Sequence, residues 1–408
     1  MPERYIPRSL EPVLERGVQE FPAVVLTGPR QAGKTTLLRR LFGAHSRYVS
    51  LELPDVRSAA TADPRGFLDA YPPPAIFDEV QYSPNLLPYV KERIDADRGR
   101  KGQYILTGSQ NLLLLEQVTE TLAGRAAILE LLPLSRREIE GRPGAPFPWE
   151  DSAARSPLSR SPAVPEIWSD LLRGSYPELL SSPERDVELW YGSYVQTYLE
   201  RDVRAVRQVG DLTQFQSFLR ALAARSANLL RLSELARDLG VAVNTVKAWI
   251  SVLEATHQVI VLRPYLANIG KRLVKTPKIY FTDTGLLSYL VGLRDPSHAA
   301  SGPMAGAIVE TAVLVEIVKT ITHRGRVPRI YFWRTSTGTE VDFVVDVDGK
   351  LVPIEVKASA TPRPAMAASI RAFREDLEDR ALPGYVVHLG DVRLPLGDNV
   401  TALPFTEL

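Results

Sequence analysis

The segment GPRQAGKT, residues 28–35, has the spacing G-x-x-x-x-G-K-[ST] that is typical of a phosphate-binding loop. Gly28 and Gly33 permit backbone conformations that a Cβ would hinder, so the loop amides can point at phosphate oxygens. Lys34, a predicted catalytic residue, would place its ammonium group against the β- and γ-phosphates, and Thr35 would offer its hydroxyl to Mg²⁺. The alternative is a glycine-rich turn without a ligand. The predicted ATP-binding residues are Gly28, Pro29, Arg30, Gln31, Ala32, Gly33, Lys34, Thr35 and Thr36.

Polar side chains end two further apolar segments, AIFD and QYILTG. After the first segment, Asp78 would hold the water shell of Mg²⁺, and Glu79 would polarise the attacking water. After the second, Ser109 in the run LTGSQN could sense the γ-phosphate. The alternative for Asp78 and Glu79 is a loop with two solvated acids. The phosphate-binding loop upstream favours the catalytic interpretation.

Arg125, in the run LAGRAA, has two interpretations between which the sequence does not decide. It could stabilise transition-state charge, either as an arginine finger acting in trans within a homo-oligomer or as a sensor of the nucleotide. It could equally be an ordinary surface arginine.

The stretch EVDFVVDVDGKLVPIEVK, residues 340–357, is a predicted β-hairpin, because an Asp-Gly pair between alternating apolar runs is a strong hairpin signal. A two-residue turn at Asp348 and Gly349 places Phe343 opposite Ile354. One face of the hairpin would then be apolar and would face the core. We expect that face to carry Val341, Phe343, Ile354 and Val356.

The same register places Asp342 opposite Glu355 on the other face, and Glu340 opposite Lys357. Two carboxylates about 5 Å apart repel by about 3 kcal/mol at an effective dielectric constant near 20. A fold can tolerate this repulsion if one acid takes up a proton, if solvent screens the pair, or if a divalent cation binds between them. Asp342 and Glu355 are therefore predicted metal ligands. The alternative is a solvated polar face in which Glu340 and Lys357 form an ion pair.

A helical segment before the hairpin supplies one more acid. The run GAIVETAVLVEIVKTI, residues 306–321, is apolar almost all round, and Glu310 shares a face with Val313 and Ile317. A carboxylate on a buried stripe is unfavourable unless it is paired or bound to a cation. Glu310 could therefore belong to the same site as Asp342. Otherwise it is a partly exposed acid near the start of a helix, where the helix dipole favours it.

These residues need a framework of strands and helices. Over the first 140 residues, short apolar strands alternate with amphipathic helices, which predicts a parallel sheet with helices on both faces. The stretch 141–165 contains six prolines and is a predicted linker or long loop. Mainly helical patterns follow it. The predicted strands are Ala23–Thr27, Arg47–Leu51, Ala75–Asp78, Gln103–Gly108 and Ala126–Leu131.

The composition bounds the function classes. The 408 residues are too many for one ordinary core, and 45% of them are hydrophobic, as in globular proteins. The absence of cysteine excludes disulfides and thiolate metal sites. The start resembles no signal peptide and no apolar run reaches membrane-spanning length, so we expect a cytoplasmic protein without a membrane partner.

The residues 200–280 are locally basic, with 13 Lys and Arg against six Asp and Glu, although the net charge of the whole chain is only +1. Within them, residues 230–262 have the pattern of a helix-turn-helix. Val246, Ile250 and Leu253 share the inner face of its second helix, and the outward residues include Asn244, Thr245, Lys247 and Ser251. Asn and Thr can contact base edges and Lys can contact phosphate, so DNA is a predicted partner. The alternatives are a packing element or a protein-binding surface.

Several phrases together resemble a bacterial and archaeal AAA+ family with a C-terminal domain long listed as of unknown function. They include YIPR, GPRQAGKTT, FDEVQ, ILTGSQ and LAGR followed by LPLS, and later GSYPELL, YVQTYLERDV, FTDTGLLSYL and EVDFVV…PIEVK. The resemblance covers most of the chain, and the proline-rich linker is its least covered part. It implies an α/β fold with a P-loop AAA+ domain, a helical and winged-helix middle, and a C-terminal domain similar to PD-(D/E)xK nucleases of the restriction-endonuclease type.

The resemblance also implies roles and boundaries. Asp342 and Glu355 would bind Mg²⁺ or Mn²⁺, Lys357 would orient or activate water, and Glu310 would assist. The expected function is Mg²⁺-dependent ATP hydrolysis coupled to DNA processing by a metal-dependent nuclease-like domain. The alternatives are an ATP-driven switch or scaffold, and a DNA-binding regulator, each with an inactive nuclease-like domain. The expected regions are the ATPase domain at 1–140, the linker at 141–165, a helical region at 166–228, a winged-helix-like region at 229–284 and the nuclease-like domain at 285–408.

Overall fold

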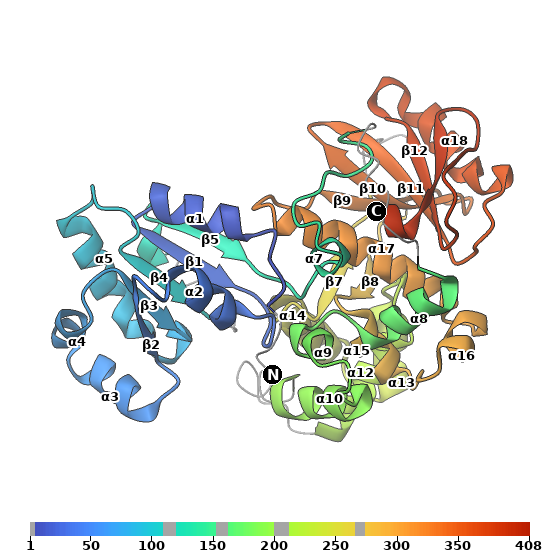
Figure 1. The fold of residues 1–408 in the computed structure, drawn as a ribbon. Helices are drawn as coiled ribbons and strands as arrows, with labels where there is room; N and C mark the ends of the chain where they lie inside the picture. The colour runs from blue at the N-terminus through green and yellow to red at the C-terminus, as the bar shows by residue number, and fades with distance from the viewer. Residues whose placement is uncertain (1–4, 109–119, 152–161, 200–211, 266–273) are drawn as a thin grey trace.

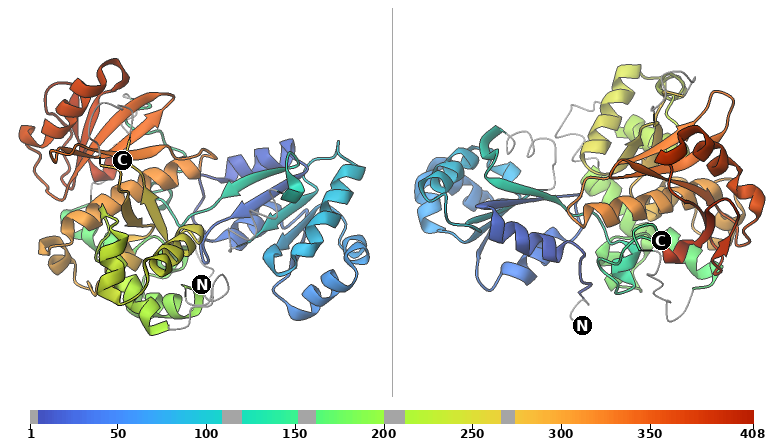
Figure 2. Two further views of the ribbon diagram at one scale, coloured as in Figure 1. Left: turned by 180° about the vertical axis from the view of Figure 1, so that it is seen from behind. Right: turned by 90° about the horizontal axis from the view of Figure 1, so that it is seen from above.

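The computed structural model describes residues 5–108, 120–151, 162–199, 212–265 and 274–408. The chain forms two lobes, which can be told apart in every view (Figures 1 and 2). The N-terminal lobe holds the parallel sheet, and the described helices and strands from α7 onward form the second lobe (Figure 1). Ser109, one of the predicted nucleotide-binding residues, lies outside the described residues. None of the described helices is long and apolar enough to cross a membrane.

The sheet of the N-terminal lobe is fully parallel, with the strand order β2-β3-β4-β1-β5. All five predicted strands are found, each within one residue of the predicted ends. In this order β4 lies between the strand that leads into the phosphate-binding loop and the strand that ends in Asp78. The strands are β1 Ala23–Thr27, β2 Arg47–Ser50, β3 Ala75–Asp78, β4 Tyr104–Thr107 and β5 Ala126–Glu130.

Helices cover both faces of this sheet. Val24 and Leu26 pack with Leu37 on one face, and Val25 packs with Phe67 on the other. Because successive side chains of a strand point to opposite faces, a strand that is buried on both sides must be apolar throughout, as AVVL is. The helices are α1 Glu11–Glu20, α2 Lys34–Phe42, α3 Pro54–Ala62, α4 Pro64–Ala70 and α5 Leu87–Ala96, with short 3₁₀ turns η1 Val80–Tyr82 and η2 Pro84–Leu86.

The middle of the chain is mostly helical. Up to Asp151 the described part of the proline-rich stretch contains no helix or strand, but Phe147 is buried and stacks on Trp149. The middle of the chain begins with α7 Arg136–Ile139, which comes before the proline-rich stretch. The later elements are α8 Val164–Arg173, α9 Pro177–Ser181, α10 Val187–Tyr194, η3 Val195–Leu199, α12 Leu212–Ala223, β6 Asn228–Leu229, α13 Leu232–Leu239, α14 Val243–Ala255, β7 Val259–Leu262, β8 Lys278–Phe281, α15 Thr284–Leu290 and α16 Pro296–Ser301.

Helices α13 and α14 form the predicted helix-turn-helix. Gly240 ends α13 with a positive φ of 65°, a conformation that glycine adopts without strain. Val246, Ile250 and Leu253 are buried, whereas Lys247 is exposed, as the helical spacing predicts. Behind the two helices lies a three-stranded antiparallel sheet with the order β6-β8-β7.

The C-terminal sheet is mixed, with the order β13-β14-β12-β11-β10-β9. Strands β9, β10 and β11 run antiparallel, and β12 lies parallel to β11. Helix α17 packs against β11, and α18 packs against β10 and β11. The elements are α17 Ala305–Thr322, β9 Ile330–Arg334, β10 Glu340–Val347, β11 Lys350–Lys357, η4 Pro364–Ala367, α18 Ala368–Leu377, η5 Glu378–Arg380, β12 Gly384–His388, β13 Leu394–Pro395, β14 Val400–Pro404 and η6 Phe405–Glu407.

The predicted hairpin is β10 and β11. Its register is confirmed from Val347 opposite Lys350 to Phe343 opposite Ile354. The expectation that Val341 shares the face of Phe343 is wrong. The pairing of β10 with β9 shifts between Val341 and Val344, and both of these residues pack on the α18 side. Such a bulge reverses the faces of the residues beyond it and can re-aim a side chain at this end of the strand.

The middle of the chain and the C-terminal sheet share one continuous apolar core. It runs from Phe147 to Leu408 and includes Trp249, Ile317 and Ile354. Helix α17 lies between the middle helices and the C-terminal sheet, and Figure 1 shows its position. The two regions of the second lobe are therefore packed as one body around α17.

Candidate nucleotide site and acidic site

The phosphate-binding loop has the backbone geometry that its two glycines predict. Gly28 has φ 139°, and a Cβ there would lie 2.1 Å from the carbonyl oxygen of Leu131. Gly33 has φ 92° and caps the N-terminus of α2. The loop therefore leads directly into a helix N-terminus, where free amides and the helix dipole favour phosphate.

Lys34 and Thr35 begin α2 at the centre of this site. The buried Lys34 Nζ donates to the carbonyl oxygens of Gly28 and Pro29, each at 2.9 Å. Thr35 Oγ1 donates to Asp78 Oδ2 at 2.9 Å, so the two predicted Mg²⁺ ligands lie side by side. A hydroxyl and a carboxylate form the kind of oxygen donor set that Mg²⁺ prefers, so these two residues fit the ion and would hold it.

Two further hydroxyls hold Asp78, and the sequence did not predict either role. Tyr48, in β2, and Thr107, in β4, both donate to its carboxylate. Burial, and then the hydrogen bond to Asp78, raise the pKa of Tyr48 to about 12. Because β2 and β4 both flank β3, the carboxylate is oriented from both sides. The sequence signal for Thr107 was its place in LTGSQN, the run with which an apolar strand ends in polar residues.

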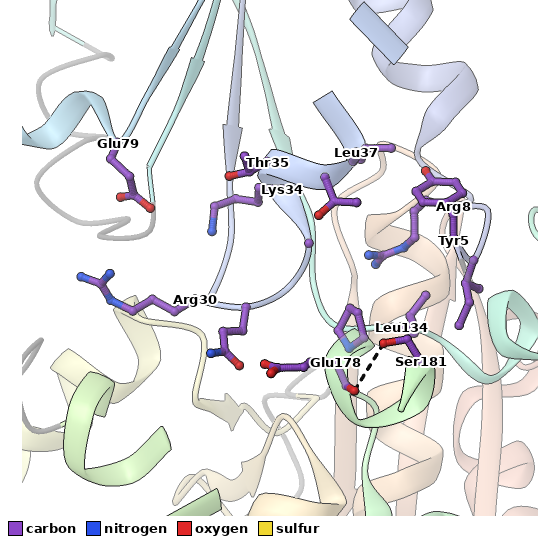
Figure 3. A pocket seen from close by; sticks show the side chains of 15 residues that line it. Tyr5, Arg8, Arg30, Lys34, Thr35, Leu37, Glu79, Leu134, Glu178 and Ser181 are labelled. Atoms are coloured by element: carbon purple, nitrogen blue, oxygen red, sulfur yellow. Dashed lines mark hydrogen bonds between the residues drawn. The ribbon is translucent and has the colours of Figure 1, made fainter. Parts of the chain in front are cut away.

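Glu79 follows Asp78 in a left-handed conformation, with φ 57° and ψ 47°. Its amide donates to Thr107 Oγ1 at 3.4 Å, and Gln81 donates to its carboxylate. Left-handed backbone is uncommon for residues other than glycine and is enriched at functional sites. Glu79 lines the same pocket as Lys34 and Thr35, and Figure 3 labels all three residues.

The nucleotide pocket has a volume of about 510 Å³, and several segments that are far apart in the sequence line it. Besides the loop, the N-terminal segment and α9 contribute, so residues from both lobes meet here (Figure 3). The phrases YIPR and GSYPELL contain these contributors, but nothing local in them indicates a shared pocket. The lining residues that the sequence did not predict are Tyr5, Ile6, Arg8, Leu37, Leu134, Pro177, Glu178 and Ser181.

Arg8 connects the loop to a buried ion cluster. Its NH1 donates to Ala32 O in the loop at 2.9 Å, and its Nε lies 3.3 Å from Glu138 Oε1. His323 Nδ1 lies 3.1 Å from the same carboxylate oxygen, and His323 Nε2 accepts from the amide of Leu132. Burial opposes ionisation of Glu138, but His323 and Arg8 hold the pKa of Glu138 well below its ordinary value.

This cluster joins three parts of the chain. Glu138 belongs to α7, and His323 caps the C-terminus of α17, the helix that carries Glu310. The Glu138 and His323 side chains are completely buried. Arg8 therefore links the loop to the Glu138 carboxylate, and His323 links α17 to the same carboxylate.

We expect Glu138→Gln to lower the free energy of unfolding by about 2–3 kcal/mol, because it removes the negative charge opposite a buried guanidinium. The urea midpoint of the purified protein measures the effect. The matched control is Glu92→Gln, since Glu92 pairs with Arg65 where both side chains are more than half exposed. That change should cost less than about 1 kcal/mol. Equal effects of the two substitutions would contradict a stabilising role for the cluster.

Arg125 is not brought to the nucleotide pocket of its own chain. Its carbonyl oxygen accepts from the amide of Ala23, at the opposite end of β1 from the loop. The five residues of β1 therefore separate it from the loop by roughly 15 Å. Its guanidinium binds Asp95 through Nε at 2.7 Å and NH2 at 3.0 Å. Its action in trans stays a prediction.

The four predicted residues of the second site converge between α17, β10 and β11. Burial raises the pKa of Asp342 well above its ordinary value, and the carboxylates of Glu310 and Glu355 raise it further. Lys357 Nζ donates to Glu355 Oε1 at 2.6 Å, and Ser369 donates to the other oxygen at 2.8 Å. The side chains are therefore close enough to share one electrostatic environment.

At the open end of the hairpin, beyond the pair of Phe343 and Ile354, side chains make the contacts. Asp342 Oδ2 accepts from the amide of Val356 at 2.8 Å. Glu340 pairs with Arg334 across β9 and β10 at 2.8 Å, and Lys357 pairs with Glu355. The alternative interpretation, an ion pair between Glu340 and Lys357, is therefore not the arrangement in the structure.

Lys278 belongs to this site, although the sequence did not predict it there. Its Nζ lies 2.9 Å from Glu310 Oε1 and 4.0 Å from Asp342 Oδ1, and it also pairs with Glu340. Burial acts against the charge, but the carboxylates of Glu310, Asp342 and Glu340 raise the pKa of Lys278. The sequence signal was the position of this lysine at the start of the apolar strand KIYF. A strand that is buried on both faces also buries its lysine, and a buried lysine needs an acidic partner.

As arranged, the acidic site does not fit a divalent cation. Among the described residues, no group of three or more His, Asp and Glu side chains is placed to hold a metal ion. The oxygens of Asp342 and Glu355 contact an amide, Lys357 and Ser369 instead, and the Lys278 ammonium group is the cation among the acids. The prediction that Asp342 and Glu355 bind metal thus has no support in this conformation.

Comparison with known proteins defines the class of the N-terminal lobe. Residues 20–140 match the family described as AAA domain. The chain therefore carries an ATPase domain of the AAA, Walker type, which implies ATP as its ligand. Residues 165–297 and 305–408 match two domains of unknown function, DUF8612 and DUF4143.

Two curated relatives cover nearly the whole chain. Uncharacterized protein Rv2008c of Mycobacterium tuberculosis and Uncharacterized protein Mb2031c of Mycobacterium bovis are each 32% identical over 400 residues, which are 97% of this chain and 82% of theirs. The chain belongs to the family of these two mycobacterial proteins. Among solved structures, the Walker-type ATPase PABY2304 of Pyrococcus abyssi is similar with a TM-score of 0.46 and 17% identity, over 71% of this chain and 97% of that one.

Proposed function

We propose that ATP hydrolysis in the N-terminal lobe controls DNA processing by the C-terminal domain, which acts as a nuclease. The observation that carries this proposal is the convergence of Glu310, Asp342 and Glu355 with Lys357. In this proposal Lys357 would neutralise charge that develops on a phosphate. A mixed sheet with a helix on either face supports the likeness to restriction endonucleases.

A physical route for the control is the buried cluster between the lobes. Arg8 contacts the loop at Ala32, and Glu138 joins Arg8 to His323 at the end of α17. Rearrangement of the loop around a γ-phosphate would change the contacts of Arg8. Since α17 also carries Glu310, a shift of this helix would reach the acidic site.

The helix-turn-helix and the sheet behind it support a winged-helix surface for DNA. Asn244 and Lys247 are exposed on α14, and Thr245 is half-buried. The surrounding region is basic, so a phosphate contact through Lys247 would add to a favourable local potential.

We expect Lys247→Ala to weaken DNA binding modestly and to make the slope of log affinity against log salt shallower by about one unit, because one phosphate contact is lost. Fluorescence anisotropy at several salt concentrations measures both quantities. The control is Lys101→Ala, which changes an exposed lysine of the other lobe. Binding that is absent or independent of salt in the intact protein would refute the DNA surface.

The nuclease proposal is tested by a cutting assay on single-stranded, double-stranded and branched DNA. Each substrate is incubated with and without ATP, in Mg²⁺ or Mn²⁺. Cutting of at least one substrate supports the proposal. If the protein cuts none of them under any of these conditions, the nuclease proposal fails.

One observation favours a second candidate, an ATP-driven switch or scaffold whose C-terminal domain is inactive. Lys278 already neutralises the acids, and among the described residues no group of three or more His, Asp and Glu side chains is placed to hold a metal ion. Calorimetry with Mg²⁺ separates the candidates, because a switch needs the ion only with the nucleotide. In that case Lys34→Ala would abolish all metal binding.

A further inference from the structure

Lys278 reaches the acidic site from another sheet. It begins β8, the central strand of the three-stranded sheet behind the helix-turn-helix, whereas the acids belong to α17 and the C-terminal sheet. Its side chain is only 4% exposed. The ammonium group lies among three carboxylates, those of Glu310, Glu340 and Asp342, and 5.7 Å from the centre of the Phe332 ring.

A second residue of the same strand holds this arrangement. Tyr280 donates to Glu310 Oε1 at 2.6 Å, the same oxygen that Lys278 contacts at 2.9 Å. Residues two apart on a strand point to the same face, so β8 presents both groups to α17 together. The position of Lys278 is therefore tied to the position of β8 and not to a flexible surface rotamer.

The ammonium group and a divalent cation would compete for the carboxylate of Asp342. A bound Mg²⁺ or Mn²⁺ needs carboxylate oxygens close to Asp342, and Lys278 Nζ is 4.0 Å from Asp342 Oδ1. A Mg²⁺ ion bound to this oxygen at about 2.1 Å would lie no more than about 6 Å from the ammonium group, and two cations so close repel each other in a buried site. The other lysine of the site, Lys357, donates to Glu355, the second predicted metal ligand, at 2.6 Å.

We infer that Lys278 is a built-in counter-ion that closes the acidic site against divalent cations. The site then accepts a metal ion only when β8 withdraws the ammonium group. This inference rests on the proposed function, because it assigns the regulation of the same site. Since β8 pairs with β6 and β7 behind the helix-turn-helix, a movement of that unit on DNA would be the event that opens the site.

Direct Mn²⁺ binding tests the inference without any cutting assay. All variants are made in the full chain with Lys34→Ala and are measured without nucleotide, so that any contribution of the phosphate-binding loop is the same in every variant. We expect Lys278→Met to bind one Mn²⁺ at least tenfold more tightly than the parent in isothermal titration calorimetry. Adding Asp342→Asn to Lys278→Met should remove that binding. Lys278→Arg, which keeps the positive charge, should behave as the parent.

The matched control is Lys275→Met, a change of an exposed lysine three residues earlier in the same segment, and it should leave Mn²⁺ affinity unchanged. Thermal unfolding gives a second readout. In EDTA, Lys278→Met should unfold at a lower temperature than the parent, and Mn²⁺ should raise its unfolding temperature more than that of the parent. If the methionine variant does not fold, Lys278→Gln replaces it, since glutamine can still donate to Glu310.

Equal Mn²⁺ affinity in the parent and the neutral variants would overturn the inference. Failure of the counter-ion inference can be distinguished from failure of the nuclease proposal. Tight Mn²⁺ binding by Lys278→Met with no cutting of any DNA would support the counter-ion and reject the nuclease. Metal-dependent cutting by the wild type, together with unchanged Mn²⁺ affinity in Lys278→Met, would support the nuclease and reject the counter-ion.

Discussion

Lys34→Ala is expected to reduce ATP turnover by at least about 100- to 1,000-fold, which is the typical loss when one group that stabilises transition-state charge is removed. Lys34 is buried at the start of α2, and its ammonium group has two loop carbonyls within 2.9 Å. A γ-phosphate in the loop would offer this group stronger, charged partners. Phosphate release measures turnover, and binding of a fluorescent nucleotide measures affinity.

The control for Lys34 is Lys101→Ala, an exposed lysine of the same lobe, which should leave turnover unchanged. The unfolding temperature of Lys34→Ala must remain near that of the wild type, because Lys34 also contributes hydrogen bonds to the loop. Turnover and nucleotide affinity that both equal those of the wild type would exclude the loop as the ATP site.

Asp342→Ala and Lys357→Ala are each expected to reduce DNA cutting to the background level. The carboxylates of Glu310 and Glu355 both raise the pKa of Asp342, so Asp342 lies close to both of them. Its replacement by alanine therefore removes the central carboxylate of the site. Removal of Lys357 leaves Glu355 without its ammonium partner and the phosphate without a neutralising charge. Gel assays on the substrate that the wild type cuts best measure the loss.

Glu375→Ala is the matched control for the acidic site, because Glu375 is an exposed carboxylate on α18, the helix beside that site. Its cutting rate should equal that of the wild type. ATP turnover provides the internal reference, since both site variants should keep it. If Asp342→Ala cuts DNA as fast as the wild type, the cutting activity does not come from this domain.

Local patterns predicted much of the framework. The five strands of the first sheet and the hairpin turn at Asp348 and Gly349 are found close to their predicted positions. Each depends on residues within a few positions of one another, as strand periodicity and turn chemistry do. The face of Val341 was mispredicted because a register shift against β9 follows from the packing of a third strand and not from the hairpin itself.

The sequence by itself determined the phosphate-binding loop, because all its functional atoms come from eight consecutive residues, 28–35, and a strand and a helix flank them. It also determined which acids could meet on the hairpin. Only the tertiary structure decided what neutralises those acids. Lys278 and Glu310 are separated by 32 residues, and Arg8 and His323 meet at Glu138 although they are 315 positions apart in the sequence. A buried charge requires an opposite charge in space, and folding can draw that partner from any part of the chain.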